Sequence, residues 1–232
     1  MSTPVKYVIS MFPMWDSFLR LSSIFGREKT KTLDEYFNEV IKHVKEKEDV
    51  LFKKLLELAP DVPSEEAYTR AMEELSKILE IEFQEDLSKM INIADNEIYP
   101  VEELQEKILN ILIPHFVEVK QKIDNDAKAL WEKALRGEIK IKDIEKFEIM
   151  DKSLFLGSNI LGIILETRDF EVMNKLLPYF VLLPARIMKV IFNNKDLSEL
   201  QEDFKLIARK IKEVHPQPTT VDDYFLEELL EK

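Results

Sequence analysis

Two uncharged stretches in the second half of the chain constrain its fold more than any other feature. Residues 153–165 and 176–185 contain no charged side chain. Large apolar residues recur in and around the second stretch every three or four positions, which is the period of a helix. A helix that is apolar on all sides is normally buried. We therefore expect an apolar helical hairpin that turns near residues 166–170 and is enclosed by other helices.

Prolines and a glycine lie within or at the end of two of the predicted helices. Pro178 and Pro184 lie within the second apolar stretch, and Pro114 lies within a helical pattern that spans 101–136. Proline removes a backbone donor, so each of these positions should kink or interrupt its helix. Gly137 is expected to end the helix that contains Pro114.

Amphipathic helical patterns account for most of the remaining sequence. Thr32 begins one with a capping box, Ser64 is expected to cap the next, and further patterns cover residues 197–214 and 221–232. We predict an all-α bundle of about seven or eight helices with a buried apolar C-terminal hairpin. Residues 1–137 would form a helical bundle with an acidic helix, and residues 138–232 the apolar hairpin with the C-terminal helices, together in one compact unit.

Amino-acid composition indicates the cellular compartment and the thermal environment of the protein. Cysteine is absent, which excludes disulfides, thiolate metal sites and a cysteine nucleophile, and favours a cytoplasmic protein. No apolar run reaches the roughly 20 residues that a membrane span needs. Charged residues make up 34 % of the chain and only four residues are glycine. Proteins of hot environments share this balance, so a thermophilic source is a hypothesis that a melting temperature can test.

Negative charge is concentrated in one part of the sequence. The chain has a net charge of −12, and residues 61–106 hold fourteen acidic and three basic residues, a local charge of −11. This balance argues against direct binding to nucleic acid. The acidic helix is either a solvated face that maintains solubility or a docking surface for a basic partner. In the second case the contact residues would be Glu66, Glu73, Glu74, Glu82, Glu85 and Asp86.

Motifs for catalysis or cofactor binding are not found. The four glycines form neither a phosphate-binding loop nor a dinucleotide fingerprint. His43, His115 and His215 lack the glutamate three positions earlier that helical di-iron bundles use. We predict no cofactor and no metal site, and we favour a protein that is not an enzyme. The sequence leaves open the hypothesis of a carboxylate site assembled from distant helices.

One short pattern occurs twice. Residues 32–39 and 220–227 agree at six of eight positions when Asp and Glu are equated. Both resemble the box through which replication and repair proteins bind the ring-shaped sliding clamp, in which an aliphatic residue and two spacers precede two aromatic residues. The resemblance implies that Val221, Tyr224 and Phe225 insert into an apolar pocket of the clamp. The C-terminal copy departs from the pattern because Pro218 occupies the usual glutamine position. Alternatively, the acidic residues begin a helix and the aromatic pair holds it against the core.

These observations favour a non-enzymatic protein that acts through protein contacts, with the acidic helix or the C-terminal helix as its contact surface. A sliding-clamp-associated replication or repair factor is the alternative. A ligand carrier or enzyme that uses a cavity around residues 154–191, an acidic mimic of nucleic acid, and association with a second copy of the chain also stay open.

Overall fold

The computed structural model describes residues 42, 46, 48–82, 101–215 and 220–231. Within these ranges the secondary structure is helical and includes no strand, so the prediction of an all-α protein is confirmed. The helices that have defined bounds are α4 (Glu48–Leu58), α5 (Glu65–Glu82), α7 (Val101–Leu135), η2 (Ile141–Asp143), α8 (Ile144–Thr167), α9 (Phe170–Phe192), η3 (Leu197–Glu199), α10 (Leu200–Val214) and α11 (Thr220–Glu231). The predicted capping box at Thr32 lies outside the described residues.

The chain forms two compact units. One comprises residues 1–58 and 70–115, and the other comprises residues 59–69 and 116–232. We call the second the C-terminal unit, although it includes the short segment 59–69. The predicted domains, residues 1–137 and 138–232, stay a prediction.

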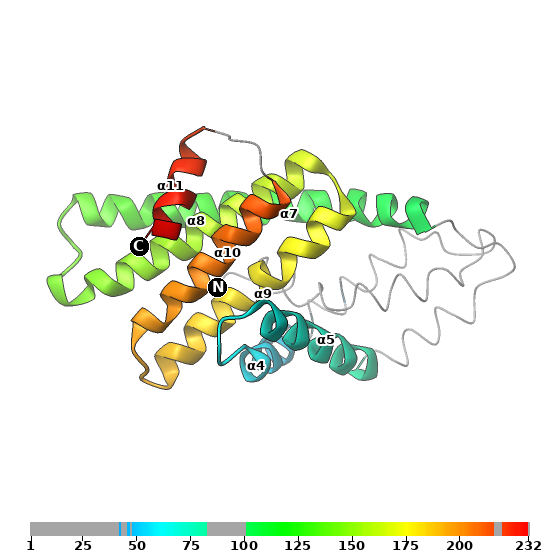
Figure 1. Ribbon diagram of the computed structural model, residues 1–232, viewed down its shortest axis with the longest axis horizontal. Coiled ribbons are helices and arrows are strands. Elements are labelled where there is room, and N and C mark those ends of the chain that lie inside the picture. The colour runs from blue at the N-terminus through cyan, green and yellow to red at the C-terminus, as the bar shows by residue number, and fades with distance from the viewer. Residues whose placement is uncertain (1–41, 43–45, 47, 83–100, 216–219, 232) are drawn as a thin grey trace, which may run out of the picture. The chain divides into compact units, whose positions relative to one another are not determined.

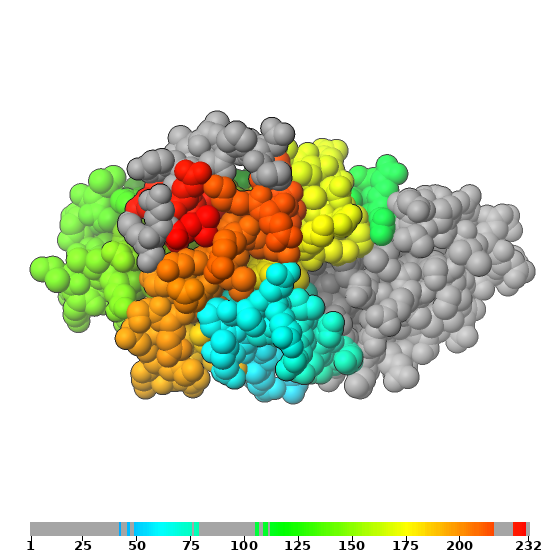
Figure 2. All heavy atoms as spheres, viewed as in Figure 1, coloured from blue at the N-terminus to red at the C-terminus, as the bar shows by residue number. Residues whose placement is uncertain are grey.

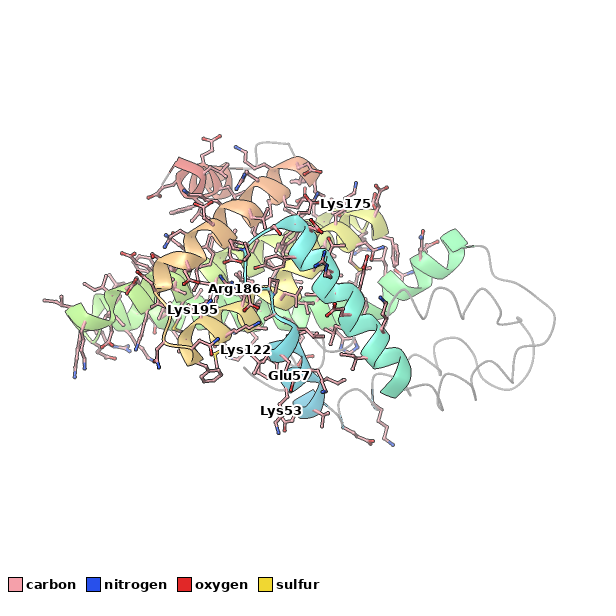
Figure 3. All side chains as sticks on the ribbon, turned by 60° about the horizontal axis from the view of Figure 1, so that its bottom comes forward. Lys53, Glu57, Lys122, Lys175, Arg186 and Lys195 are labelled. Atoms are coloured by element: carbon pink, nitrogen blue, oxygen red, sulfur yellow. The ribbon has the colours of Figure 1, made fainter. Side chains whose placement is uncertain are left out.

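In the first unit, the described residues bury an apolar stripe on each helix. Lys54 and Glu57 form an ion pair on the outside of α4, with 3.2 Å between Nζ and Oε2. Two charged residues of α4, Lys53 and Glu57, are marked in Figure 3 and are exposed. The buried side chains, at three-to-four spacing, are Leu51, Leu55, Ala71, Leu75, Leu109 and Leu112.

The C-terminal unit is built around three helices that pack on one another. Arg168 and Asp169 connect α8 to α9, and α8 packs against α9. Helix α10 contacts both, and α11 packs beside α10 (Figure 1). Because α10 touches every other helix of this group, a residue on its inner face can meet side chains from several elements.

Helix ends in this unit follow from local residue chemistry. Asp169 caps α9 by accepting from the amides of Glu171 at 2.7 Å and Val172 at 3.1 Å. Gly137 ends α7 with φ at 69°, and its amide donates to Ala134 while the next amide donates to Lys133. These two bonds form a Schellman motif, as the position of Gly137 predicts. The predicted cap at Ser64 is also confirmed, because its hydroxyl accepts from the Ala67 amide.

The predicted interruption of these helices at their prolines does not occur, whereas the alternative, a kink, stays a prediction. Helix α7 continues through Pro114, and α9 continues through both Pro178 and Pro184. A proline removes one hydrogen bond from a helix, a loss that packing on both sides can offset. Residues 179–183, which lie between the two prolines of α9, are all buried.

Candidate functional site

A buried polar group occupies the interior of the C-terminal unit. Tyr68 of α5, Arg186 of α9 and Asp203 of α10 have at most 1 % of their side chains exposed. The Tyr68 hydroxyl donates to Asp203 Oδ1 at 2.8 Å, and Arg186 Nε donates to Asp203 Oδ2 at 3.4 Å. Arg186, which is labelled in Figure 3, belongs to α9, and its side chain is buried between helices. Three segments that are distant in the sequence therefore meet at one carboxyl group.

Burial dominates the electrostatics of this group. It raises the pKa of Asp203, although the Tyr68 hydroxyl and the Arg186 guanidinium partly oppose that shift. Burial also raises the pKa of Tyr68 well above its usual value, and the neighbouring negative charge of Asp203 adds to the effect. Arg186 reaches a second carboxylate, with Nη2 3.7 Å from Glu199 Oε2.

The arrangement of these three residues suits a structural role. A substrate cannot touch side chains that are closed to solvent, so the group fits internal bracing better than catalysis. Two ion pairs at its edge hold the segment 59–69 in place. Lys189 binds Asp61 at 2.9 Å, and Lys210 binds Glu65 at 2.7 Å.

A pocket of about 220 Å³ lies elsewhere in the same unit, among α7, α8, α10 and α11. Asn159 and His215 contribute to its wall, and each has one buried polar atom without a hydrogen-bond partner. Buried polar atoms are satisfied in most folded proteins, so two exceptions in one pocket are unusual. Next to the pocket, the Ser158 hydroxyl donates to Asp124 at 2.5 Å, and Asp124 also binds Lys120 at 2.8 Å.

A third feature is the α7–α8 tip, which we define as residues 131–150. It carries several large apolar side chains in solvent. Leu135 is 83 % exposed and Ile141 is 88 % exposed. Trp131, Ile144 and Met150 are also exposed. The tip, in light green, extends beyond α9 and α10 in Figure 1 and in the space-filling view of Figure 2.

Contacts at the base of the tip fix its position. The Trp131 ring meets the Phe147 ring edge to face at 5.2 Å, and Trp131 Nε1 donates to Asp151 at 2.7 Å. Burial raises the pKa of Asp151, and the indole donor partly opposes that shift. The exposed residues therefore project from a braced helical hairpin.

The residues predicted to bind a partner are placed only in part. Glu66, Glu73 and Glu74 lie exposed on α5. The Glu82 backbone ends α5, whereas Glu85 and Asp86 lie outside the described residues. The function of this acidic surface stays a prediction.

The C-terminal box lies on α11. The backbones of Val221 and Tyr224 are helical, and their side chains lie outside the described parts of the chain. Phe225 is 46 % exposed, and its ring centre is 5.6 Å from that of Phe155 on α8. Leu226, the next residue, is buried. In addition, Glu227 binds Lys212 of α10 at 2.9 Å.

The described residues contain no group of three or more His, Asp or Glu side chains that could hold a metal ion. None of the helices within the described ranges combines the length and apolar character of a membrane span.

Sequence reasoning missed the tip because its apolar residues are separated by charges. Between residues 137 and 150 every apolar residue has a charged neighbour, so the segment resembles a solvated connector. The exposed tip could have been recognised from three isoleucines, Ile139, Ile141 and Ile144. A solvated connector does not need large apolar side chains, so their presence indicates another role. Asp203 was missed because a charge within an amphipathic pattern is normally assigned to the solvent face.

Comparison with known proteins gives no relative. No protein-family model, no curated protein and no solved structure matches the chain.

Proposed function

We propose that the protein acts without catalysis, by binding another protein through the α7–α8 tip. The observation that carries this proposal is the exposure of Leu135 and Ile141, each more than four-fifths accessible to solvent. Apolar side chains that remain in water on a folded domain often mark a contact surface, because a partner gains free energy by covering them.

The charge of the tip indicates the chemistry of its partner. The chain as a whole has a net charge of −12, whereas residues 131–150 contain five basic and five acidic residues. A neutral tip on an acidic protein is not repelled by an acidic partner and is not strongly attracted by a basic one. The partner that fits is a protein with an apolar groove lined by few charges.

The tip is also suited to binding because its base is already ordered. The Schellman motif at Gly137 and the Trp131 contacts hold the two helix ends before a partner arrives. A preorganised surface loses less conformational entropy on binding than a flexible segment.

Site-specific photo-crosslinking tests the proposal directly. A photoreactive amino acid at position 135 or 141 should give a discrete adduct with one protein in an extract of the source cells. Position 174 is the matched control, because Asn174 is exposed on α9 and lies outside the tip. Excess wild-type protein should abolish the adduct, whereas excess Leu135→Ser/Ile141→Ser protein should not. Equal labelling from position 174, or equal competition by the double variant, would contradict the proposal.

Docking of α11 onto a sliding clamp is a second candidate. The partial exposure of Phe225 favours it, since an aromatic residue of the box must be accessible to enter a pocket. The contact with Phe155 and the burial of Leu226 favour packing of α11 on its own unit instead.

Titration calorimetry with a purified sliding clamp separates these two roles of α11. The clamp hypothesis requires Phe225→Ala to abolish binding while the melting temperature stays nearly constant. Phe192→Ala is the matched control, because Phe192 is an exposed phenylalanine of α9 outside the box. Loss of stability in Phe225→Ala without clamp binding by the wild type would assign Phe225 to core packing.

A further inference from the structure

The pocket in the C-terminal unit has two polar atoms that require a partner. Asn159 Oδ1 and His215 Nε2 are buried and make no hydrogen bond with the residues that the structure describes. Leaving such an atom unsatisfied destabilises the folded protein, because the atom has lost its hydrogen bond to water. Both residues line the same pocket, so a group that enters it can bind these atoms once the two side chains turn toward it.

The rest of the wall defines what else the occupant needs. Phe155 and Ile163 of α8, Ile211 of α10 and Leu226 of α11 provide apolar surface. The wall also contains the polar residues Lys120, Ser158, Asn159, Glu166 and His215, so an occupant needs both an apolar part and a polar group.

Charge in the wall favours an uncharged occupant. The lining includes one cation, Lys120, and one anion, Glu166. Lys120 is already bound to Asp124 at 2.8 Å, and Glu166 is exposed to solvent. Neither sign of charge is favoured within the pocket, and desolvation of an ionised ligand would not be compensated.

We propose that this pocket binds a small uncharged alcohol with an apolar ring or chain. A hydroxyl group can serve either atom, because it donates to the amide oxygen of Asn159 and can donate to or accept from the imidazole nitrogen of His215. The apolar part packs against the aliphatic and aromatic wall.

The volume of the pocket limits the size of this ligand. A cavity of about 150 Å³ holds benzene, so the pocket of about 220 Å³ has room for one ring with a short substituent. Leu226 forms part of the wall, so binding of the alcohol also covers the inner side of α11. The site is separate from the α7–α8 tip and does not depend on its function.

Two probes of equal size test the role of the hydroxyl group. The intact chain is titrated with 2-phenylethanol and, in parallel, with propylbenzene, and protein NMR shifts give the dissociation constants. One net hydrogen bond contributes about 1 kcal/mol, so 2-phenylethanol should bind at least about fivefold more tightly. Equal affinity for the two probes, or no saturable binding of 2-phenylethanol, overturns the proposal.

Two variants locate the binding site. Asn159→Leu should reverse the preference in favour of propylbenzene, because it replaces the unsatisfied amide with an apolar side chain of similar size. Asn174→Leu makes the same change at an exposed position of α9 and should leave both affinities unchanged. If Asn159→Leu fails to fold, Gly162→Leu decides, since a side chain at this wall position fills part of the pocket. Gly162→Leu should weaken both probes at least tenfold, and wild-type affinity in this variant overturns the proposal.

Discussion

Arg186 is a charged residue within the most apolar helix of the C-terminal unit, and its partners explain why it is tolerated there. Asp203 and Glu199 face it from α10 and η3, and Tyr68 completes the coordination of Asp203. Breaking a buried group of this kind is costly, because the partners that remain cannot regain water. The sequence does not reveal the group, since Tyr68 and Asp203 are 135 positions apart.

The Tyr68 hydroxyl can be removed without changing the shape of the ring. Tyr68→Phe should lower the free energy of unfolding by about 1–3 kcal/mol, because Asp203 Oδ1 loses its donor in a buried site. Urea denaturation at neutral pH measures the change. Tyr179→Phe is the matched control, since its ring is buried 5.0 Å from that of Tyr68 and it makes the same chemical change. A loss below about 0.5 kcal/mol in Tyr68→Phe would show that this hydrogen bond contributes little.

Alkaline pH tests the electrostatics of the same region. Burial raises the pKa of Tyr179 from 10.0 to about 12. The folded protein therefore retains the tyrosine proton more strongly than the unfolded chain. The resulting stability is fully present below pH 10 and is lost as pH rises through 12. Between pH 10 and 12 the melting temperature of the wild type should fall more steeply than that of Tyr179→Phe. Parallel curves for the two proteins would contradict the assigned shift.

Among the elements, helix periodicity and capping were predictable, whereas the sequence did not decide whether the prolines kink or interrupt their helices. The sequence pattern of α10 identifies Leu200, Phe204, Ile207 and Ile211, all of which are buried. Local signals at Ser64 and Gly137 mark helix ends correctly. The continuity of α7 and α9 through their prolines depends on packing with distant segments, and a single sequence does not show that packing.

The same substitution should have opposite effects at two glycines. At Gly162 of α8 an added Cβ meets only Lys120 Cε at 3.6 Å, an ordinary contact. Gly162→Ala should therefore raise the free energy of unfolding by about 0.5–1 kcal/mol through helix propensity. Gly137→Ala should lower it by about 1 kcal/mol, because φ there is 69°. Thermal and urea denaturation of both variants check the signs, and stabilisation by Gly137→Ala would contradict the Schellman geometry.

For the whole molecule, the fold class followed from the sequence and the candidate sites did not. Uncharged stretches and helical periods are local properties, so they identify an all-α protein. The tip and the pocket depend on which side chains remain uncovered after packing. Leu135 illustrates the difference, because it lies in the helical pattern of residues 101–136 and yet is one of the most exposed large apolar residues described in the C-terminal unit.

Salt dependence distinguishes the tip from the acidic helix as the contact surface. Binding through the neutral, apolar tip should change less than about threefold in affinity between 50 and 500 mM salt, because few charges are paired across it. Binding through the glutamates of α5 should weaken steeply over the same range. The dissociation constant of the crosslinked partner at the two salt concentrations is the measurement, and a loss of tenfold or more would contradict the tip as the main contact.

The affinity of that purified partner for Leu135→Ser/Ile141→Ser is the most direct test of the proposed function. Two apolar anchors that a partner covers contribute about 2 kcal/mol each at a binding surface, so the double variant should bind on the order of 1,000-fold more weakly than the wild type. Its unfolding free energy should stay within about 0.5 kcal/mol of the wild-type value, because both side chains are exposed. An unchanged dissociation constant in this folded variant would contradict the proposal that the protein works through its α7–α8 tip.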